Sequence, residues 1–451
     1  MRKAFSSQQR LDCHAVAEVK LNFNCRDEII PILAGLQHIY SQPRLRDEIL
    51  ACVAQDVNKH SRSDRGRKGL DYWHIIVLAA VRLGCNLDYD KLQDLAEQHR
   101  AMRQIMEIGD WQEQIDFNWR RIRDNICLLK PGTIEAISHC IVDEAYRLEP
   151  DAVKKQRADS FVVETNIHYP TESSLIVDGV RKTIELCVEL FDVYDITGWR
   201  QHAHLLKKVK QTARQIARIS ARKGAEYKDR LAGQYRKLLG RAEAIIMRAT
   251  QACETLQNEY ALDVLSEANI AQIKLFIERT RQVCGTARRR VLLGETVPNE
   301  DKLFSMFEPH TQLYRRGKAG QPNQFGRLVL IYEDAAGFIS HHYVMPRDAQ
   351  DQDVAVEQTR KLQQRLDHRV EEISFDRGFH SPGNHDQLAE IVAHVCLPKP
   401  GKKQATEQAE TASVSFHQAR QRHPGVESAI GALQSGNGLV RTRDESEVGF
   451  E

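Results

Sequence analysis

The sequence predicts a mixed α/β domain whose first strand is separated from the others by a large all-helical insertion, with an all-helical region before it. Three observations lead to this fold class. Apolar residues in the first 150 positions recur at helical spacing, and a short β-rich run near residue 160 is followed by more than a hundred residues of helical character. From about residue 325, short apolar runs alternate with amphipathic segments. This last pattern is typical of a sheet with helices on both faces.

Residues 1–150 are expected to form helices. Residues 71–83 place apolar side chains on one face, Asp88 can cap the next helix, and a third helix follows Pro131, with Thr133 as its cap. Helix, short turn, helix is compatible with a DNA-binding helix-turn-helix, although ordinary packing of two helices is more common. Four basic residues between positions 62 and 68 precede this region and are a further candidate for phosphate contact.

The predicted insertion is strongly basic. An extended run at 157–170 ends at Pro170, and helical spacing then continues to about residue 290. Between Arg200 and Arg248 there are fourteen Lys or Arg residues and three acidic residues. Basic residues that recur every three or four positions share one helix face, and here they include Lys207, Lys210, Arg214 and Arg218. This face is either a solvated surface of a helical hairpin or a surface for DNA.

The strands of the C-terminal part follow a recognisable order. A hairpin of two strands is predicted at 328–331 and 338–344, with a turn between them. A helix, a strand, a helix, a strand and a last helix then follow, at 349–368, 370–375, from 381, at 395–397 and around 427. Without the insertion, three strands precede alternating helices and strands. This is the ribonuclease H-like order, which has a mixed sheet.

Three acidic residues far apart in the sequence lie in different predicted secondary-structure elements. Asp159 lies in the first predicted strand, Asp376 at the end of a later strand, and Glu427 in the first turn of the last helix. Two-metal cleavage of a phosphodiester uses such carboxylates, because Mg²⁺ prefers oxygen ligands and a pair of ions can activate the nucleophile and stabilise the leaving oxygen. Spacing alone leaves alternatives open, since a helix dipole also favours an acid in the first turn. Acids near the first strand that compete with Asp159 are Glu164, Glu172 and Asp178.

Several function classes are disfavoured by composition. The ten cysteines contain no Cys-x-x-Cys pair, which argues against a zinc ribbon, and the sequence has no His-Glu-x-x-His motif and no phosphate-binding loop. No apolar run is long enough for a membrane span, and the N-terminus has no apolar signal core. We therefore expect a cytoplasmic protein without a membrane partner.

Four sequence segments resemble bacterial insertion-sequence transposases with a DDE triad, in particular the group labelled ISNCY. They are residues 158–174 (ADSFVVETNIHYPTESS), 375–381 (FDRGFHS), 397–402 (LPKPGK) and 423–430 (HPGVESAI). The resemblance covers essentially the whole chain. It implies that the triad is Asp159, Asp376 and Glu427, which would bind two Mg²⁺ ions, with Mn²⁺ as a substitute.

The resemblance also implies a reaction and its partners. Water would first hydrolyse a DNA strand to leave a 3′-hydroxyl, which would then attack a phosphate of target DNA. Double-stranded DNA, as element ends and as target, would be the partner of a homodimer or larger synaptic assembly that is nucleoid-associated when bound. Further cations expected to contact phosphates are Lys318, Arg377, Lys399, Lys402 and Arg420.

The predicted domains follow from this division. Residues 1–150 would bind DNA ends or dimerise, residues 151–171 with 301–451 would form the catalytic domain, and residues 172–300 the basic insertion. Two alternatives are a nuclease of the same fold without strand transfer and a truncated, non-catalytic DNA-binding copy. The second is raised because relatives usually continue with an apolar helix beyond Gly449 and Phe450.

Overall fold

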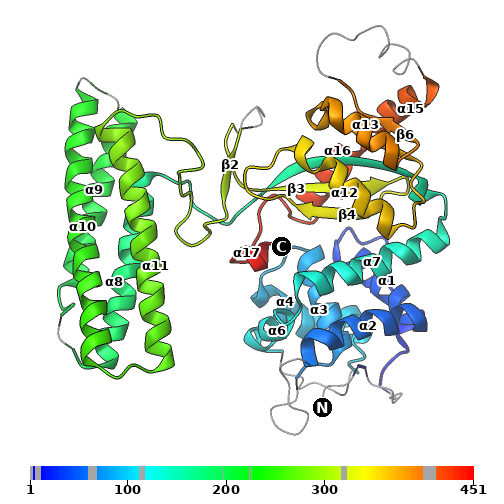
Figure 1. Ribbon diagram of the computed structural model, residues 1–451. Helices are drawn as coiled ribbons and strands as arrows, with labels where there is room; N and C mark the ends of the chain where they lie inside the picture. The colour runs from blue at the N-terminus through cyan, green and yellow to red at the C-terminus, as the bar shows by residue number, and fades with distance from the viewer. Residues whose placement is uncertain are drawn as a thin grey trace. The chain divides into compact units, whose positions relative to one another are not determined.

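The computed structural model describes residues 4–5, 12–58, 69–109, 111, 117–196, 198–222, 224, 226–315, 322–399 and 413–451 (Figure 1). The chain forms two compact units. The first comprises Met1–Glu164, Leu328–Asp444 and Val448–Glu451, and the second Thr165–Arg327 with Glu445–Glu447.

The N-terminal part of the first unit is helical, as predicted. After the short 3₁₀ turn η1 (Val16–Glu18), its helices are α1 (Ile29–Ser41), α2 (Pro43–Asn58), α3 (Tyr72–Gly84), α4 (Tyr89–Gln98), α5 (Arg100–Ile105), α6 (Trp119–Ile126) and α7 (Pro131–Leu148). Trp73 of α3 is buried in their apolar core, and its indole N–H donates to the carbonyl of Ile105 over 2.7 Å. Asp88 caps α4 as expected. The cap expected at Thr133 is wrong: Lys130 precedes the first turn of α7, and the Thr133 hydroxyl donates to buried Asp56 over 2.5 Å instead. The basic cluster at 62–68 lies outside the described residues.

A six-stranded mixed sheet forms the other part of this unit and extends into the second. Its strands are β1 (Lys155–Glu164), β2 (Gln312–Tyr314), β3 (Gln324–Asp334), β4 (Ile339–Val344), β5 (Glu372–Phe375) and β6 (His394–Cys396). The order is β2-β3-β1-β5-β6, and β4 also pairs with β3. The β3–β4 hairpin is antiparallel, whereas β5 pairs parallel to β1 and β6 parallel to β5. The strands predicted from the sequence are present, while β2, which has only three residues, was not predicted.

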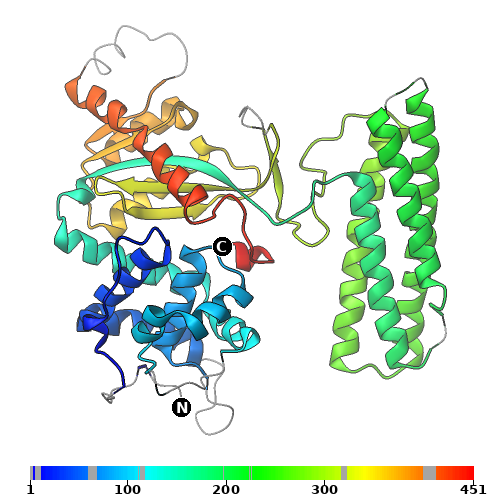
Figure 2. The same ribbon diagram turned by 180° about the vertical axis from the view of Figure 1, so that it is seen from behind.

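Helices cover both faces of the sheet. Helix α12 (Asp351–Arg365) lies on the face seen in Figure 1, and α15 (Val414–Arg422) and α16 (Gly425–Ser435) cross the opposite face, seen in Figure 2. The remaining elements are η2 (Ala152–Lys154), η4 (Arg377–Phe379), α13 (Pro382–Ile391) and α17 (Glu447–Phe450). Helix α15 was not predicted, because its segment is polar and carries little apolar periodicity. These layers confirm a mixed α/β architecture after a helical N-terminal region.

The second unit is dominated by four long helices: α8 (Glu172–Val193), α9 (His202–Arg222), α10 (Tyr227–Glu259) and α11 (Val264–Ala287), which ends in the π-helical turn η3 (Arg288–Leu292). They share one apolar core. The chain enters and leaves this unit at neighbouring points, since the backbone N–H of Thr165 donates to the carbonyl of Phe325 over 3.0 Å. Among the described helices, none has the length and apolarity that a membrane crossing requires.

A buried histidine makes the stability of the sheet depend on pH. His341 of β4 lies against Gln358 of α12, with 3.0 Å between its Nε2 and the amide oxygen, and burial lowers its pKa to about 4. Between pH ~6.5 and about 4, the His341 imidazole is therefore protonated in the unfolded chain but neutral in the folded chain. We expect the free energy of unfolding to fall as pH drops through this window, and His341→Gln to remove that component. In urea titrations, the wild-type advantage over the variant should shrink by roughly 2 kcal/mol between pH 7 and pH 4.5. A difference that stays constant with pH would contradict this.

Candidate functional site

The parallel pairing of β1 with β5 brings two of the predicted acids to the same sheet edge. The register ends with Arg157 opposite Ser374 and Ala158 opposite Phe375. The next residue on each side is Asp159 and Asp376, and the backbone of Asp376 is still extended. Neighbouring strands lie about 4.8 Å apart, so the two aspartates are adjacent.

Both aspartates belong to the sheet face that α15 and α16 cover. Side chains alternate along a strand, so Asp159 shares its face with Arg157 and Phe161. Arg157 reaches the carbonyl of Arg422 at the end of α15, and Phe161 packs in the cluster that contains Val426 and Ile430 of α16. The Asp159 side chain, which is half-buried, therefore lies between these contacts. On β5, Ser374 faces the same side, and Asp376 follows it by two residues.

Helix α16 brings Glu427 to this face. Val426 and Ile430 are buried against Phe161 and Val163 of β1, and Leu433 packs at the border of the same cluster. This confirms the predicted apolar stripe of the helix. Glu427 immediately follows Val426 in the first turn and is exposed. Glu427 therefore lies at the border of the buried stripe, on a helix that covers the same face of the sheet to which Asp159 belongs.

A contact that we name the Arg157 latch holds the start of α16. Its members are Arg157, Glu333 of β3, the carbonyl of Arg422, and Gly425. The Arg157 guanidinium donates from Nε to the Glu333 carboxylate over 2.5 Å and from Nη1 to the Arg422 carbonyl over 3.1 Å. Gly425 allows this approach, since a Cβ at that position would lie 2.1 Å from Nη1. The latch thus fixes the turn from which Glu427 projects.

Two further contacts attach the same turn to β5. The Ser374 hydroxyl lies 3.2 Å from Nδ1 of His423, and the Arg422 guanidinium pairs with Glu372. Burial lowers the pKa of His423, while the nearby carboxylates of Asp376 and Glu427 oppose this shift. The His423 imidazole therefore interacts electrostatically with both carboxylates. The junction of α15 and α16 spans the two strands that carry Asp159 and Asp376.

The loop after Asp376 is also firmly held. Phe379 is fully buried and packs against Phe375 with the rings tilted and their centroids 5.2 Å apart. The Asn384 amide donates to the carbonyls of Phe379 and Gln352 over 3.0 Å and 2.6 Å. On the opposite face of the sheet, Asp351 of α12 accepts a hydrogen bond from Ser160, 2.5 Å away. Near Asp159, strand β1 therefore contacts α12 on one face of the sheet and α16 on the other.

The donor chemistry of the three acids suits a hard divalent cation, because carboxylate oxygens are the ligands that Mg²⁺ prefers. Their side chains are not gathered as a preformed cage: within the described ranges, no three His, Cys, Asp or Glu side chains are arranged to hold a metal ion. Each aspartate instead accepts the N–H of the residue that follows it, Asp159 over 2.7 Å and Asp376 over 2.6 Å. The three acids therefore do not form a metal site as the structure describes them.

The acids that compete with Asp159 are engaged elsewhere. Glu164, at the end of β1, pairs with Arg441 over 3.0 Å. Glu172 pairs with Arg290, and Asp178 lies 3.4 Å from His168, within the second unit. Of these candidates, only Asp159 is in register with Asp376. Asp159 is thus the one of these four acids that directly follows the last residue pair of the β1–β5 register, on the same side as Asp376.

The cations predicted to contact phosphates fall into three groups. Arg377, in η4, and Arg420, on α15, are exposed in the first unit. Lys318 and Lys402 lie outside the described residues. Four cations are exposed on α9 of the second unit: Lys207, Lys210, Arg214 and Arg218.

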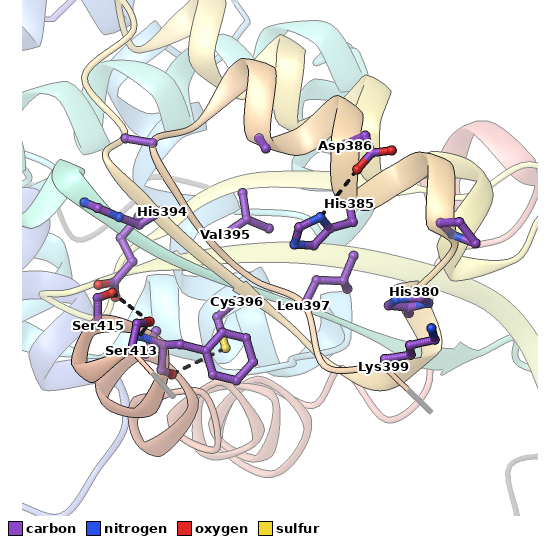
Figure 3. Close-up of a pocket in the computed structure, with 16 residues that line it drawn as sticks. His380, His385, Asp386, His394, Val395, Cys396, Leu397, Lys399, Ser413 and Ser415 are labelled. Atoms are coloured by element: carbon purple, nitrogen blue, oxygen red, sulfur yellow. Dashed lines mark hydrogen bonds and ion pairs between the residues drawn. The ribbon is translucent and has the colours of Figure 1, made fainter. Parts of the chain in front are cut away.

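Lys399 lines a pocket of about 670 Å³ between β6, α13 and α15. Figure 3 shows His380, which follows η4, close to Lys399 at one end, with Val395 and Leu397 on the floor. His380 is four residues beyond Asp376, so this pocket opens near the edge that carries the acids.

Sequence reasoning missed the residues that position the site. These residues are Arg157, Glu333 and Ser374, which lie on three different strands. Their contacts join residues far apart in the chain, so no local sequence pattern predicts them. One signal was available: Arg157 precedes Asp159 by two residues and therefore shares its face.

The latch predicts a difference between two glycines of the same helix. Gly425→Ala should lower the free energy of unfolding by about 1–3 kcal/mol, because the new Cβ overlaps the Arg157 guanidinium. Gly431→Ala, whose Cβ meets nothing within 4 Å, should be neutral or stabilising by about 0.5–1 kcal/mol. Urea denaturation provides the measurement. In an Arg157→Ala background the cost of Gly425→Ala should largely disappear, and an unchanged cost would refute the overlap as its cause.

Comparison with known proteins found no match: no family model, no curated protein and no solved structure matches this chain. What the protein does must therefore be inferred from its own carboxylates, the strands that hold them and the cations around them.

Proposed function

We propose that this protein is a DDE transposase that binds the ends of a mobile DNA element, cleaves DNA strands there and joins the freed 3′ ends to target DNA. Asp159, Asp376 and Glu427 are the proposed catalytic residues. They would hold two divalent cations, Mg²⁺ or Mn²⁺.

One observation carries the proposal. The β1–β5 register makes Asp159 and Asp376 neighbours, and the turn that precedes Glu427 is anchored on both strands by Arg157, Ser374 and Glu372. These contacts support the proposal that three acids far apart in sequence act together at this edge of the sheet.

The proposed ribonuclease H-like fold of the catalytic domain is supported by the strand arrangement. The first strand of the domain, β1, lies between the β3–β4 hairpin on one side and the parallel strands β5 and β6 on the other. Helices cover both faces (Figures 1 and 2). Helices α8 to α11 follow β1, at the point where the order of elements in the sequence predicts an insertion into this domain.

The proposed chemistry assigns each group a task. Bound divalent cations would supply the positive charge that lets water or a 3′-hydroxyl attack an anionic phosphodiester. Asp159 would supply a ligand oxygen from β1, Asp376 one from the residue that follows β5, and Glu427 one from the exposed first turn of α16. Arg377 and Arg420, which are exposed nearby, would hold DNA phosphates, Arg through its bidentate fork.

The proposed partners follow from the reaction. Two element ends must be brought together with target DNA, so a homodimer or larger assembly on double-stranded DNA is expected. The N-terminal helices are the proposed end-binding module, and the protein would act in the cytoplasm on the nucleoid.

The carboxylates can be tested one at a time. Asp376→Asn and Glu427→Gln keep the size of each side chain but weaken it as a cation ligand. We expect each change to lower strand cleavage of element-end DNA in Mg²⁺ by more than about a hundredfold. Mutating residues that only hydrogen-bond to metal ligands already lowers metal affinity or activity by roughly 10–100-fold, and a ligand itself should matter more. DNA binding, measured by gel shift in EDTA, should persist. Glu390→Gln, an exposed acid of α13, is the matched control and should cleave normally. Cleavage by the Asp376→Asn protein at the wild-type rate would end the proposal.

Strand transfer distinguishes a transposase from a nuclease of the same fold. Element-end duplexes that already carry a free 3′-hydroxyl, incubated with the protein, a plasmid and Mg²⁺, should be covalently joined to the plasmid. Joined products are seen as labelled plasmid on a denaturing gel. Shortened duplexes without joined product would instead favour a nuclease, and no reaction with intact binding would favour a non-catalytic DNA-binding protein.

A further inference from the structure

A cationic groove runs between α9 and α10 of the helical unit. Its volume is about 390 Å³. Two arginines from α9 and two cations from α10 line it: Arg214, Arg218, Lys237 and Arg241. The remaining lining residues are glutamines and Thr212, so no acidic side chain belongs to the groove. The α10 wall was not anticipated from the sequence, because only the fold places it opposite α9.

Among the residues that the structure describes, no acidic side chain pairs with the cations of this groove. Helix α9 has no Asp or Glu over its 21 residues. Arg214, Arg218 and Lys237 form no hydrogen bond or ion pair within the described part of the chain. Glu243, an acid of α10, pairs with Arg288 at 2.5 Å. Four like charges in one groove repel one another, which favours binding of an external anion.

The groove is held in shape by the bundle beneath it. Val209 and Ile216 of α9 and Leu238 of α10 are buried in the shared core. Thr212 is also buried, and the Arg241 guanidinium contacts both its hydroxyl and the carbonyl of Lys208, the latter over 2.6 Å. The helices thus cannot separate to relieve the repulsion without exposing apolar core.

The spacing of the cations suits an extended polyanion rather than a single small anion. Arg214 and Arg218 are one helical turn apart, which is about 6 Å, and so are Lys237 and Arg241. The row on α9 from Lys207 to Arg218 is about 16 Å long, which exceeds a single small anion, whereas each strand of duplex DNA carries one phosphate per roughly 3.4 Å of axis. Lys207 continues the row along α9, whereas Lys210 lies near Asp178 and is partly neutralised by it. Arginine forks and glutamine amides are both donors to phosphate oxygens.

We propose that this groove binds the sugar-phosphate backbone of double-stranded DNA without reading its sequence. The inference deepens the proposed function, since the choice of DNA as the polyanion rests on it. The groove contains no candidate catalytic residue, so it would anchor DNA whether or not the acids at the sheet edge are active.

The test compares two double variants that remove the same charge. Arg214→Gln with Lys237→Gln removes two of the three groove cations that have no protein partner in the described part of the chain, one from each helix. Lys228→Gln with Arg236→Gln removes two exposed cations of α10 that do not line the groove. Binding of a labelled 30-base-pair duplex of arbitrary sequence to the full chain is followed by fluorescence anisotropy in EDTA, over a range of chloride concentrations.

We expect the groove variant to bind at least about tenfold more weakly at 0.1 M salt, and its slope of log affinity against log salt to shrink by about 2, one unit per lost phosphate contact. The control variant should retain the wild-type slope. Equal losses in both variants, or no loss in either, would overturn the groove assignment. Thermal melting followed by circular dichroism must be unchanged for both, and a less perturbing pair, Arg214→Lys with Lys237→Arg, should restore binding.

Two outcomes separate this inference from neighbouring ones. If inorganic phosphate displaced the duplex far more effectively than chloride at equal ionic strength, the groove would be a small-anion site and the backbone assignment would be wrong. Because the assay contains EDTA, it does not depend on cleavage. If the wild-type protein did not cleave element-end DNA but the groove variant still bound the duplex more weakly than the control, the catalytic proposal alone would be wrong. If the wild-type protein cleaved but the groove and control variants bound equally, the groove proposal alone would be wrong.

Discussion

The parallel pairing of β1 with β5 is the constraint on which the candidate site depends. Its register decides that Asp159 and Asp376 are neighbours and that both face α16 rather than α12. Side chains alternate between the two faces of a sheet, so a slip of one residue would turn one aspartate to the opposite face. Buried residues on both faces of β1, among them Ala158 and Phe161, make such a slip costly. The same packing that stabilises the sheet therefore specifies the geometry of the acids.

The junction of α15 and α16 translates this register into a position for Glu427. Glu333 is almost fully buried, and an ion pair in such a place contributes little net stability, because desolvation offsets the attraction. Removing one partner leaves the other charge buried and is costly. The Arg157–Glu333 pair thus matters more for where α16 begins than for how stable the protein is. That two neighbouring contacts, Ser374 with His423 and Arg422 with Glu372, act on the same turn supports this interpretation.

Much of the architecture could be predicted from the sequence because local periodicity carries it. The apolar stripe of Val426, Ile430 and Leu433, the strand that ends at Asp376, and the helical character of residues 172–300 all follow from spacing. Elements without a local signal were missed: β2 is too short, and α15 is too polar. Thr133 matched a capping pattern, but a distant buried partner, Asp56, claimed its hydroxyl. The Arg157 latch and the α10 wall of the groove depend on contacts between residues far apart in the chain, which no single-sequence pattern encodes.

The hydrogen bond between Thr165 and Phe325 has a consequence for how the chain folds. During synthesis β1 emerges long before β5: Phe375 of β5 follows its partner Ala158 of β1 by 217 residues. Closing so long a loop is entropically expensive, and an unpaired strand edge meanwhile invites aggregation. Helices α8 to α11 share one apolar core of their own and are complete before β5 is synthesised, so they can form early. Once formed, they bring the two ends of the insertion together, so that β3 meets β1 across a connection that is effectively short. The bundle would then act as a folding clamp for the sheet, beside any role it has in binding.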